Sequence, residues 1–87
     1  MKFKEKIADI IALPKEITLN LPLVVLTGRQ ELDIENYKGI LEYTEKKIRV
    51  NTKAGLLVAE GNKFRLKQLT AENLLLTGDI ERVYYVS

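Results

Sequence analysis

The chain has 87 residues, a formal net charge of +2 and 46% hydrophobic residues, a size and composition typical of one globular domain with a modest core. It contains no cysteine and no histidine. Disulfides are therefore excluded, the two commonest zinc ligands are missing, and a Ser-His-Asp triad cannot form. We expect a protein that is not an enzyme and that binds no cofactor.

The first 13 residues have the spacing of an amphipathic helix, which Pro14 ends. Its apolar face carries Phe3, Ile7, Ile10 and Ile11. We expect this helix to cover the core of the domain or, through its lysines, to lie on an anionic membrane surface. No segment approaches the ~20 apolar residues of a membrane span, and Asp9 interrupts the only run similar to a signal peptide. A cytoplasmic location is the expectation.

From residue 15 onward the hydrophobic period changes from 3.6 to 2, which is typical of strands. Ile48 and Val50, for example, alternate with Arg49 and Asn51. The pattern predicts about seven or eight strands of roughly six residues each, joined by turns. Glycine is expected at the strand edges, because a residue there often needs positive φ. The five glycines are Gly28, Gly39, Gly55, Gly61 and Gly78.

Connections this short cannot make parallel crossovers, so strand pairing should be mainly antiparallel. The predicted fold class is therefore all-β: an antiparallel meander that forms a small sandwich, roll or open barrel, with one short N-terminal helix. Residues 1–87 are expected to form a single domain, with the helix at 1–13 and the β domain at 15–87. A solenoid is the alternative architecture, since short strands punctuated by glycine fit it too.

The tripeptide Leu-Thr-Gly occurs twice, at residues 26–28 and 76–78. In both places an apolar run reaches the glycine, and an alternating run resumes after a polar step. The repeat predicts two similar strand-to-strand corners.

One row of like charge consists of the acidic residues Glu31, Asp33 and Glu35. On one strand face their spacing is about 6.8 Å. This is near the spacing of the carboxylates of a glycosidase, and a divalent cation site is also conceivable. The solvent-facing side of an amphipathic strand accounts for the row without either function, and we favour that interpretation.

A second row consists of the basic residues Lys63, Arg65 and Lys67, and residues 46–67 as a whole contain seven basic side chains against Glu60 alone. The row is a candidate for binding phosphates of nucleic acid. A helix followed by bent strands is also similar to the RNA-binding Sm-like barrels. Phe64 alternates with the row and so points to the other strand face, and the nearby Tyr37 and Tyr43 are not interleaved with the row, which argues against this function.

The acidic row and the basic row could instead bind each other. Acidic and basic ladders can pair across a sheet. If they are not neighbours within one molecule, they favour head-to-tail association of copies. A third candidate contact is the exposed portion of "ENYKGILEY" at residues 35–43, because we expect Asn36 and the aromatic ring of Tyr37 at an exposed turn beside an apolar strand; a simple hairpin tip is the alternative.

Taken in order along the chain, several segments resemble the YabP/YqfC family of endospore-formation proteins, with the YqfC branch closest. The resemblance extends from about residue 3 to residue 86. Its most specific stretches are "TLNLP" at 18–22, "ELDIENYKGILEY" at 31–43 and "IRVNT" at 48–52. The chain departs from the family at Leu23, where members tend to carry an arginine.

The resemblance implies a small accessory protein made in the mother cell of a sporulating bacterium, with no catalytic residue or cofactor. Our hypothesis is a non-catalytic assembly protein that acts through protein–protein contacts of a β surface. Its partners would be other sporulation proteins, membrane-bound ones included, or further copies of itself. It would act in the cytoplasm or at the periphery of a membrane. The alternative is an RNA-binding small β-barrel that uses the basic strand face.

Overall fold

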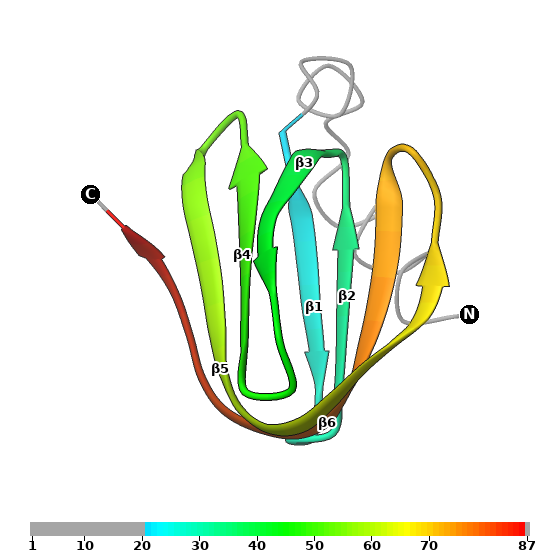
Figure 1. Ribbon diagram of the computed structural model, residues 1–87. Coiled ribbons are helices and arrows are strands. Elements are labelled where there is room, and N and C mark those ends of the chain that lie inside the picture. The colour runs from blue at the N-terminus through cyan, green and yellow to red at the C-terminus, as the bar shows by residue number, and fades with distance from the viewer. Residues whose placement is uncertain (1–20, 87) are drawn as a thin grey trace.

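The computed structural model describes residues 21–86, which form a single six-stranded antiparallel sheet (Figure 1). The predicted helix at residues 1–13 lies outside the described residues. The order of the strands across the sheet is β1-β2-β6-β5-β4-β3. In chain order they are β1 Leu23–Thr27, β2 Glu31–Glu35, β3 Tyr37–Tyr43, β4 Lys47–Thr52, β5 Gly55–Leu69 and β6 Asn73–Val86.

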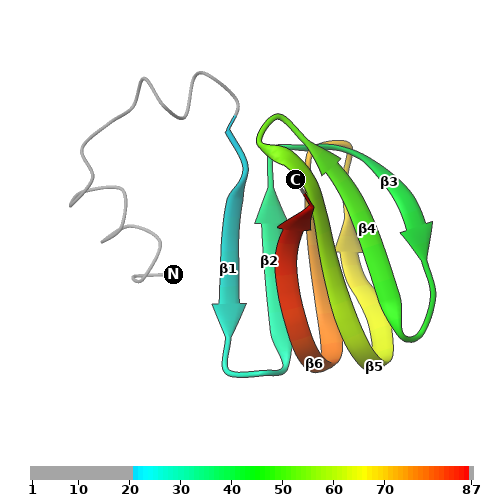
Figure 2. The same ribbon diagram turned by 90° about the vertical axis from the view of Figure 1, so that its left-hand side faces the viewer.

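The sheet is folded into two layers by its two longest strands. β5 has 15 residues and β6 has 14, and together they make one hairpin that bends sharply in the middle (Figures 1 and 2). The N-terminal half of β6 pairs with β2, whereas the N-terminal half of β5 pairs with β4. The first layer therefore contains β1, β2 and the closed end of the hairpin, and the second contains β3, β4 and the open end.

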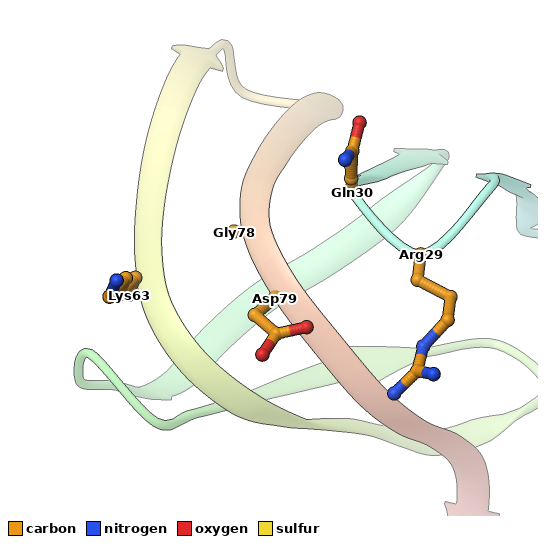
Figure 3. Close-up of a pocket in the computed structure, with 5 residues that line it drawn as sticks. All are labelled: Arg29, Gln30, Lys63, Gly78 and Asp79. Carbon is orange, nitrogen blue, oxygen red and sulfur yellow. The ribbon is translucent and has the colours of Figure 1, made fainter.

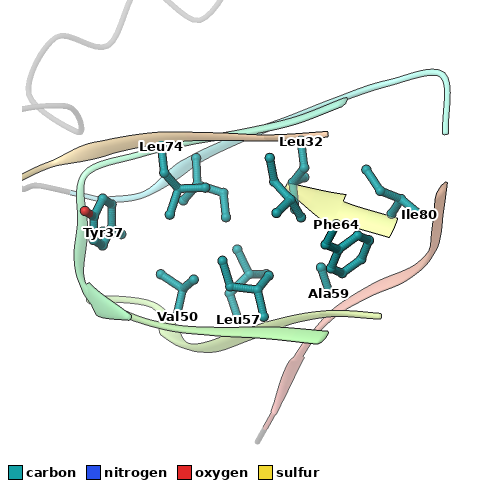
Figure 4. Close-up of a cluster of buried hydrophobic side chains, with 11 residues drawn as sticks. Leu32, Tyr37, Val50, Leu57, Ala59, Phe64, Leu74 and Ile80 are labelled. Carbon is teal, nitrogen blue, oxygen red and sulfur yellow. The ribbon is translucent and has the colours of Figure 1, made fainter. Parts of the chain in front are cut away.

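The core lies between the two layers and is built by alternation along the strands. In β2, Leu32 and Ile34 are fully buried while the residues between and beside them face outward. Figure 4 shows the leucines of β2 and β6 opposite the side chains of β4 and β5, with Tyr37 at one end of the core and Ile80 at the other. The cluster consists of Leu32, Ile34, Tyr37, Ile48, Val50, Leu57, Ala59, Phe64, Leu74, Leu76 and Ile80.

The predicted all-β antiparallel fold is confirmed. Within residues 21–86 the chain has fewer strands than the alternation predicts, because it does not turn at Gly61 or at Gly78; both glycines lie inside long strands. The meander is also interrupted once. β2 pairs with β6 and not with β3, because the chain crosses from the first layer to the second after Glu35.

Candidate interaction surface

The bend of the β5–β6 hairpin depends on two glycines, Gly61 in β5 and Gly78 in β6. Each of them lies directly against the opposite strand. A Cβ atom added at Gly61 would overlap the carbonyl oxygen of Asp79. One added at Gly78 would lie 2.8 Å from the carbonyl oxygen of Lys63 and from Cδ1 of Phe64. Gly78 also has a φ of 148°, in a region that only glycine adopts readily. The two strands can therefore approach this closely only without side chains at these positions.

The turn between β1 and β2 packs on this bend. The carbonyl oxygen of Gln30 accepts a hydrogen bond of 3.1 Å from the Gly78 N–H, and that of Arg29 accepts one of 2.8 Å from the Ile80 N–H. The turn that follows the first Leu-Thr-Gly stretch is thus hydrogen-bonded to the second stretch. The prediction that they form similar corners is wrong, because the first ends β1 at a tight turn and the second continues through β6.

A shallow hollow of about 660 Å³ lies where the turn meets the bend, lined by Arg29, Gln30, Lys63, Gly78 and Asp79 (Figure 3). The side chains of Arg29 and Asp79 extend along the same stretch of β6 in this view. The lining combines two basic groups with one carboxylate, so it selects neither an anion nor a cation by charge alone.

The basic row is less regular than its sequence spacing predicts. Lys63 has a φ of 59°, at the bend, and the pairing of β5 with β6 shifts register between Asn62 and Arg65 and again between Leu66 and Gln68. Lys63, Arg65 and Lys67 are all exposed, but these irregularities prevent them from forming one straight ladder.

The acidic row does lie on one face. Glu31, Asp33 and Glu35 alternate with the buried residues of β2 and point away from the core. However, β6 separates β2 from β5, so the acidic and basic rows are not on neighbouring strands. The hypothesis that they pair across the sheet within one molecule is therefore wrong; head-to-tail association stays a prediction.

The outward face of the second layer holds a different charge cluster, centred on Glu60. Its carboxylate lies 4.0 Å from Nζ of Lys47 and 3.3 Å from Nη1 of Arg82, and it accepts a hydrogen bond of 2.9 Å from the Tyr84 hydroxyl. This hydrogen bond, followed by partial burial and the negative charge of Glu60, raises the pKa of Tyr84 above its usual value. The Arg82 guanidinium, 5.0 Å from the centre of the Tyr84 ring, opposes that rise.

A second ion pair lies on the same face, between Arg49 and Glu42 at 3.4 Å. Arg49 and Lys47 both belong to the chain segment with the excess of basic residues. Both side chains contact glutamates, from β3 and β5 respectively. These contacts neutralise part of the excess positive charge, so less of it is available to bind a polyanion. Such half-exposed pairs contribute little stability, typically about 0–1 kcal/mol each.

The turn at Asn36 and Tyr37 differs from its predicted form. Asn36 has a φ of 65° and donates a side-chain hydrogen bond of 3.1 Å to the Leu21 carbonyl oxygen. Tyr37 is only 9% exposed, belongs to the core and donates its hydroxyl hydrogen bond to the Thr70 carbonyl oxygen. The expectation of an exposed aromatic ring at this turn is wrong, because the ring closes one end of the core.

The exposed aromatic and aliphatic side chains lie instead at the ends and edges of the strands. Tyr85 and Val86 are 43% and 46% exposed at the end of β6. That part of β6 pairs with β5 on one side and with no described strand on the other. Neither residue is among the contacts predicted from the sequence. The sequence feature that indicates a contact here is the apolar run "VYYV" near the end of the chain, because it contains no charge that would protect a sheet edge.

Residues 21–86 contain no group of three or more side chains placed to hold a metal ion. Within the same residues no helix is long and apolar enough to cross a membrane.

These observations define the class of the protein: a small all-β domain made from one bent antiparallel sheet, with charged and apolar side chains arranged on open strand surfaces. Residues 20–87 match the model of the YabP family, and the chain belongs to this family. It is also 31% identical, over 85 residues, to the uncharacterized protein YqfC of Bacillus subtilis (strain 168). The match covers 98% of this chain and 91% of the relative, which confirms the resemblance found in the sequence.

Proposed function

We propose that the protein is a non-catalytic accessory protein of endospore formation, and that it acts by binding other proteins through its β surface. The observation that carries the proposal is membership of the YabP family, whose model matches residues 20–87, together with the likeness of nearly the whole chain to the YqfC protein of Bacillus subtilis. The family resemblance associates such proteins with the mother cell. The cytoplasm of that cell, including the periphery of its membranes, is the proposed location.

The arrangement of the charged side chains supports a role without catalysis. Perturbed ionisable groups in a cleft are the usual mark of an active site. Among residues 21–86 the charge cluster around Glu60 lies on an open sheet face, where Glu60 is already bound to two cations and a hydroxyl. The acidic row of β2 likewise lies on a strand face and not in a cleft.

The proposal is tested in a sporulating host. Deletion of the gene is expected to reduce the yield of heat-resistant spores, and a tagged copy is expected to restore it and to recover sporulation proteins from the lysate. A matched pair of variants separates the two surfaces: Arg65→Glu with Lys67→Glu changes the edge of β5, and Glu31→Lys with Glu35→Lys changes the outer face of β2. A normal spore yield after deletion, with no specific protein recovered, would contradict the proposal.

RNA binding is the second candidate, because Lys63, Arg65 and Lys67 are all exposed on the same half of β5. Fluorescence anisotropy with labelled single-stranded RNA distinguishes the two functions. Binding through phosphates would weaken steeply between about 50 and 200 mM salt. Under the proposed function we expect no binding near physiological salt, and a salt-dependent complex that is lost in the Arg65→Glu, Lys67→Glu variant would favour RNA instead.

A further inference from the structure

Because the sheet is bent and does not close, its strands leave free edges among residues 21–86. They are the outer edges of β1 and β3, the C-terminal half of β5 and the C-terminal half of β6. A free edge presents unpaired backbone N–H and C=O groups to any other strand, and natural proteins usually protect it. The four edges differ in this protection.

Three of the edges carry recognisable protection. β1 has only five residues and starts directly after Pro22. β3 shifts register twice against β4, which bends its edge. The C-terminal half of β5 carries the exposed Lys67, and the N–H of Leu66 is already bound to the Tyr43 hydroxyl at 3.0 Å.

Beyond Arg82, the edge of β6 has no such protection along residues 83–86. Arg82 pairs with Glu60 and Val86 with Leu56, without a register shift between them. The four residues after Arg82 are Val-Tyr-Tyr-Val, with no proline, glycine or charge. A bulge comes just before this segment, where the register shift between Glu60 and Gly61 leaves Glu81 opposite no residue of β5. The bulge limits regular pairing to residues 82–86.

We propose that residues 82–86 pair with the same residues of a second copy of this chain, so that the second layers of two molecules form one continuous sheet. A strand that meets its own copy across a two-fold axis normal to the sheet is necessarily antiparallel. The axis passes through Tyr84, and the contact is closed because each copy uses the same edge.

The side chains along this edge complement themselves. Residues directly opposite each other in a sheet point to the same face. With the axis at Tyr84, the outward face joins Tyr84 to the partner's Tyr84 and Arg82 to the partner's Val86. The inward face joins Val83 to the partner's Tyr85. Aromatic–aromatic and aromatic–β-branched pairs are among the favourable cross-strand pairs, and this register places no like charges opposite each other.

A second copy therefore fits the edge better than contact between different edges of two molecules. Pairing of β6 with another edge would be heterologous and would produce rings or open chains of molecules in place of a two-fold dimer. Self-pairing also covers Tyr85 and Val86, two of the large hydrophobic side chains exposed in the single chain. The inference goes beyond the proposed function, since purified protein tests the dimer and sporulating cells test the function.

The mass of the purified full chain is the first test, measured by sedimentation equilibrium over a wide range of concentrations and at low and high salt. We expect a dimer whose mass does not depend on salt, because backbone hydrogen bonds and apolar pairs hold it. Val86→Lys would place a lysine opposite the partner's Arg82 at both ends of the contact, and Tyr84→Lys would place two lysines together on the axis. Both variants are expected to be monomers.

Leu41→Lys is the matched control, because Leu41 is an exposed hydrophobic residue at the edge of β3. This variant is expected to remain a dimer. Circular dichroism of each variant shows whether the fold is kept. Val86→Lys should disturb the fold less than Tyr84→Lys, because Val86 is exposed at the end of its strand. A monomer at every concentration, or a mass that grows beyond the dimer, would overturn the proposal.

Cysteine cross-linking tests the register. The chain has no cysteine of its own, so a single introduced cysteine can form only an intermolecular disulfide. With a mild added oxidant, Tyr84→Cys is expected to give a covalent dimer, and a mixture of Val83→Cys with Tyr85→Cys is expected to cross-link the two variants to each other. Leu41→Cys should stay monomeric on a denaturing gel. Equal cross-linking of Leu41→Cys and Tyr84→Cys would contradict the proposed edge.

Discussion

The turn after the tripeptide Leu-Thr-Gly at residues 26–28 is hydrogen-bonded to the same tripeptide at residues 76–78, but the two tripeptides differ in burial and in backbone role. Leu26 is 47% exposed at the end of an edge strand, whereas Leu76 is fully buried in the core. Gly28 has a φ of 55° and open space where a side chain would be, whereas Gly78 has a φ of 148° and is enclosed by the backbone and by Phe64 of β5.

The comparison teaches that a glycine can end a strand or allow it to bend, and that its neighbours in space decide which. At residue 28 the chain reverses into β2 through a turn that the Gln30 N–H closes by a hydrogen bond to the Thr27 carbonyl oxygen, with Gly28 in the left-handed region. At residue 78 the neighbouring strand β5 bends at the same place through Gly61, so pairing continues on both sides of the bend. The carbonyl groups of Arg29 and Gln30 then join the turn to the bend.

The largest effect is expected at Gly61, which tests whether close approach of the strands is what distinguishes the bend from the turn. Gly61→Ala should lower the free energy of unfolding by about 4 kcal/mol or more, because the new Cβ meets the rigid backbone of Asp79. Urea unfolding followed by circular dichroism measures the loss. Gly39→Ala is the control, since no atom lies within 4 Å of its Cβ position, and it should change stability little. Equal stability of the two variants would contradict the packing of the bend.

The two repeated glycines can be compared directly. Gly78→Ala should cost about 3 kcal/mol, from crowding together with an unfavourable φ. Gly28→Ala should cost only about 1 kcal/mol, because the left-handed φ is its single disadvantage.

Asparagine sharpens this comparison, since it tolerates the left-handed region near a φ of 55° but not a φ of 148°. Gly28→Asn should therefore be more stable than Gly28→Ala, whereas Gly78→Asn should be no better than Gly78→Ala. Thermal unfolding of the four variants measures both differences. Rescue by asparagine at both positions would show that the two corners are equivalent.

The smallest effect is expected at Arg29, which tests whether side chains help to join the turn to the bend. Its Nε lies 3.5 Å from the Ile80 carbonyl oxygen, at the outer limit of a hydrogen bond, whereas its backbone oxygen accepts a hydrogen bond of 2.8 Å. Arg29→Ala should therefore change the free energy of unfolding by no more than about 0.5 kcal/mol. A loss as large as that of Gly78→Ala would assign the contact to the guanidinium group.

The sequence predicts the parts of the fold that depend on local alternation. Leu32 and Ile34, like Ile48 and Val50, are buried as their period of two indicates. The pairing of β2 with β6 could not be predicted, because it joins residues about 40 positions apart and no local pattern specifies it. Glycine patterns also do not distinguish a turn from a bend. The sequence therefore predicts four short strands where the structure has the two long strands β5 and β6.

The candidate site was less predictable for a related reason. Exposure of the acidic row follows from its strand alone, and that expectation is correct. Burial of Tyr37 depends on the carbonyl group of Thr70, which is 33 residues away. The uneven course of the basic row depends on the positive φ of Lys63, which is uncommon for a residue other than glycine. The last two features depend on how the β5–β6 hairpin is placed and bent, and not on the local sequence.

The β5–β6 hairpin belongs to both layers, and this has a consequence for how the domain loses its structure. Neither layer can separate from the other while the hairpin stays intact, because each contains half of both strands. Opening one layer would break the ladder that supports the other. Backbone amides in β2 and in β4 should therefore exchange their hydrogens with solvent through the same all-or-none event, although these strands lie on opposite sides of the core.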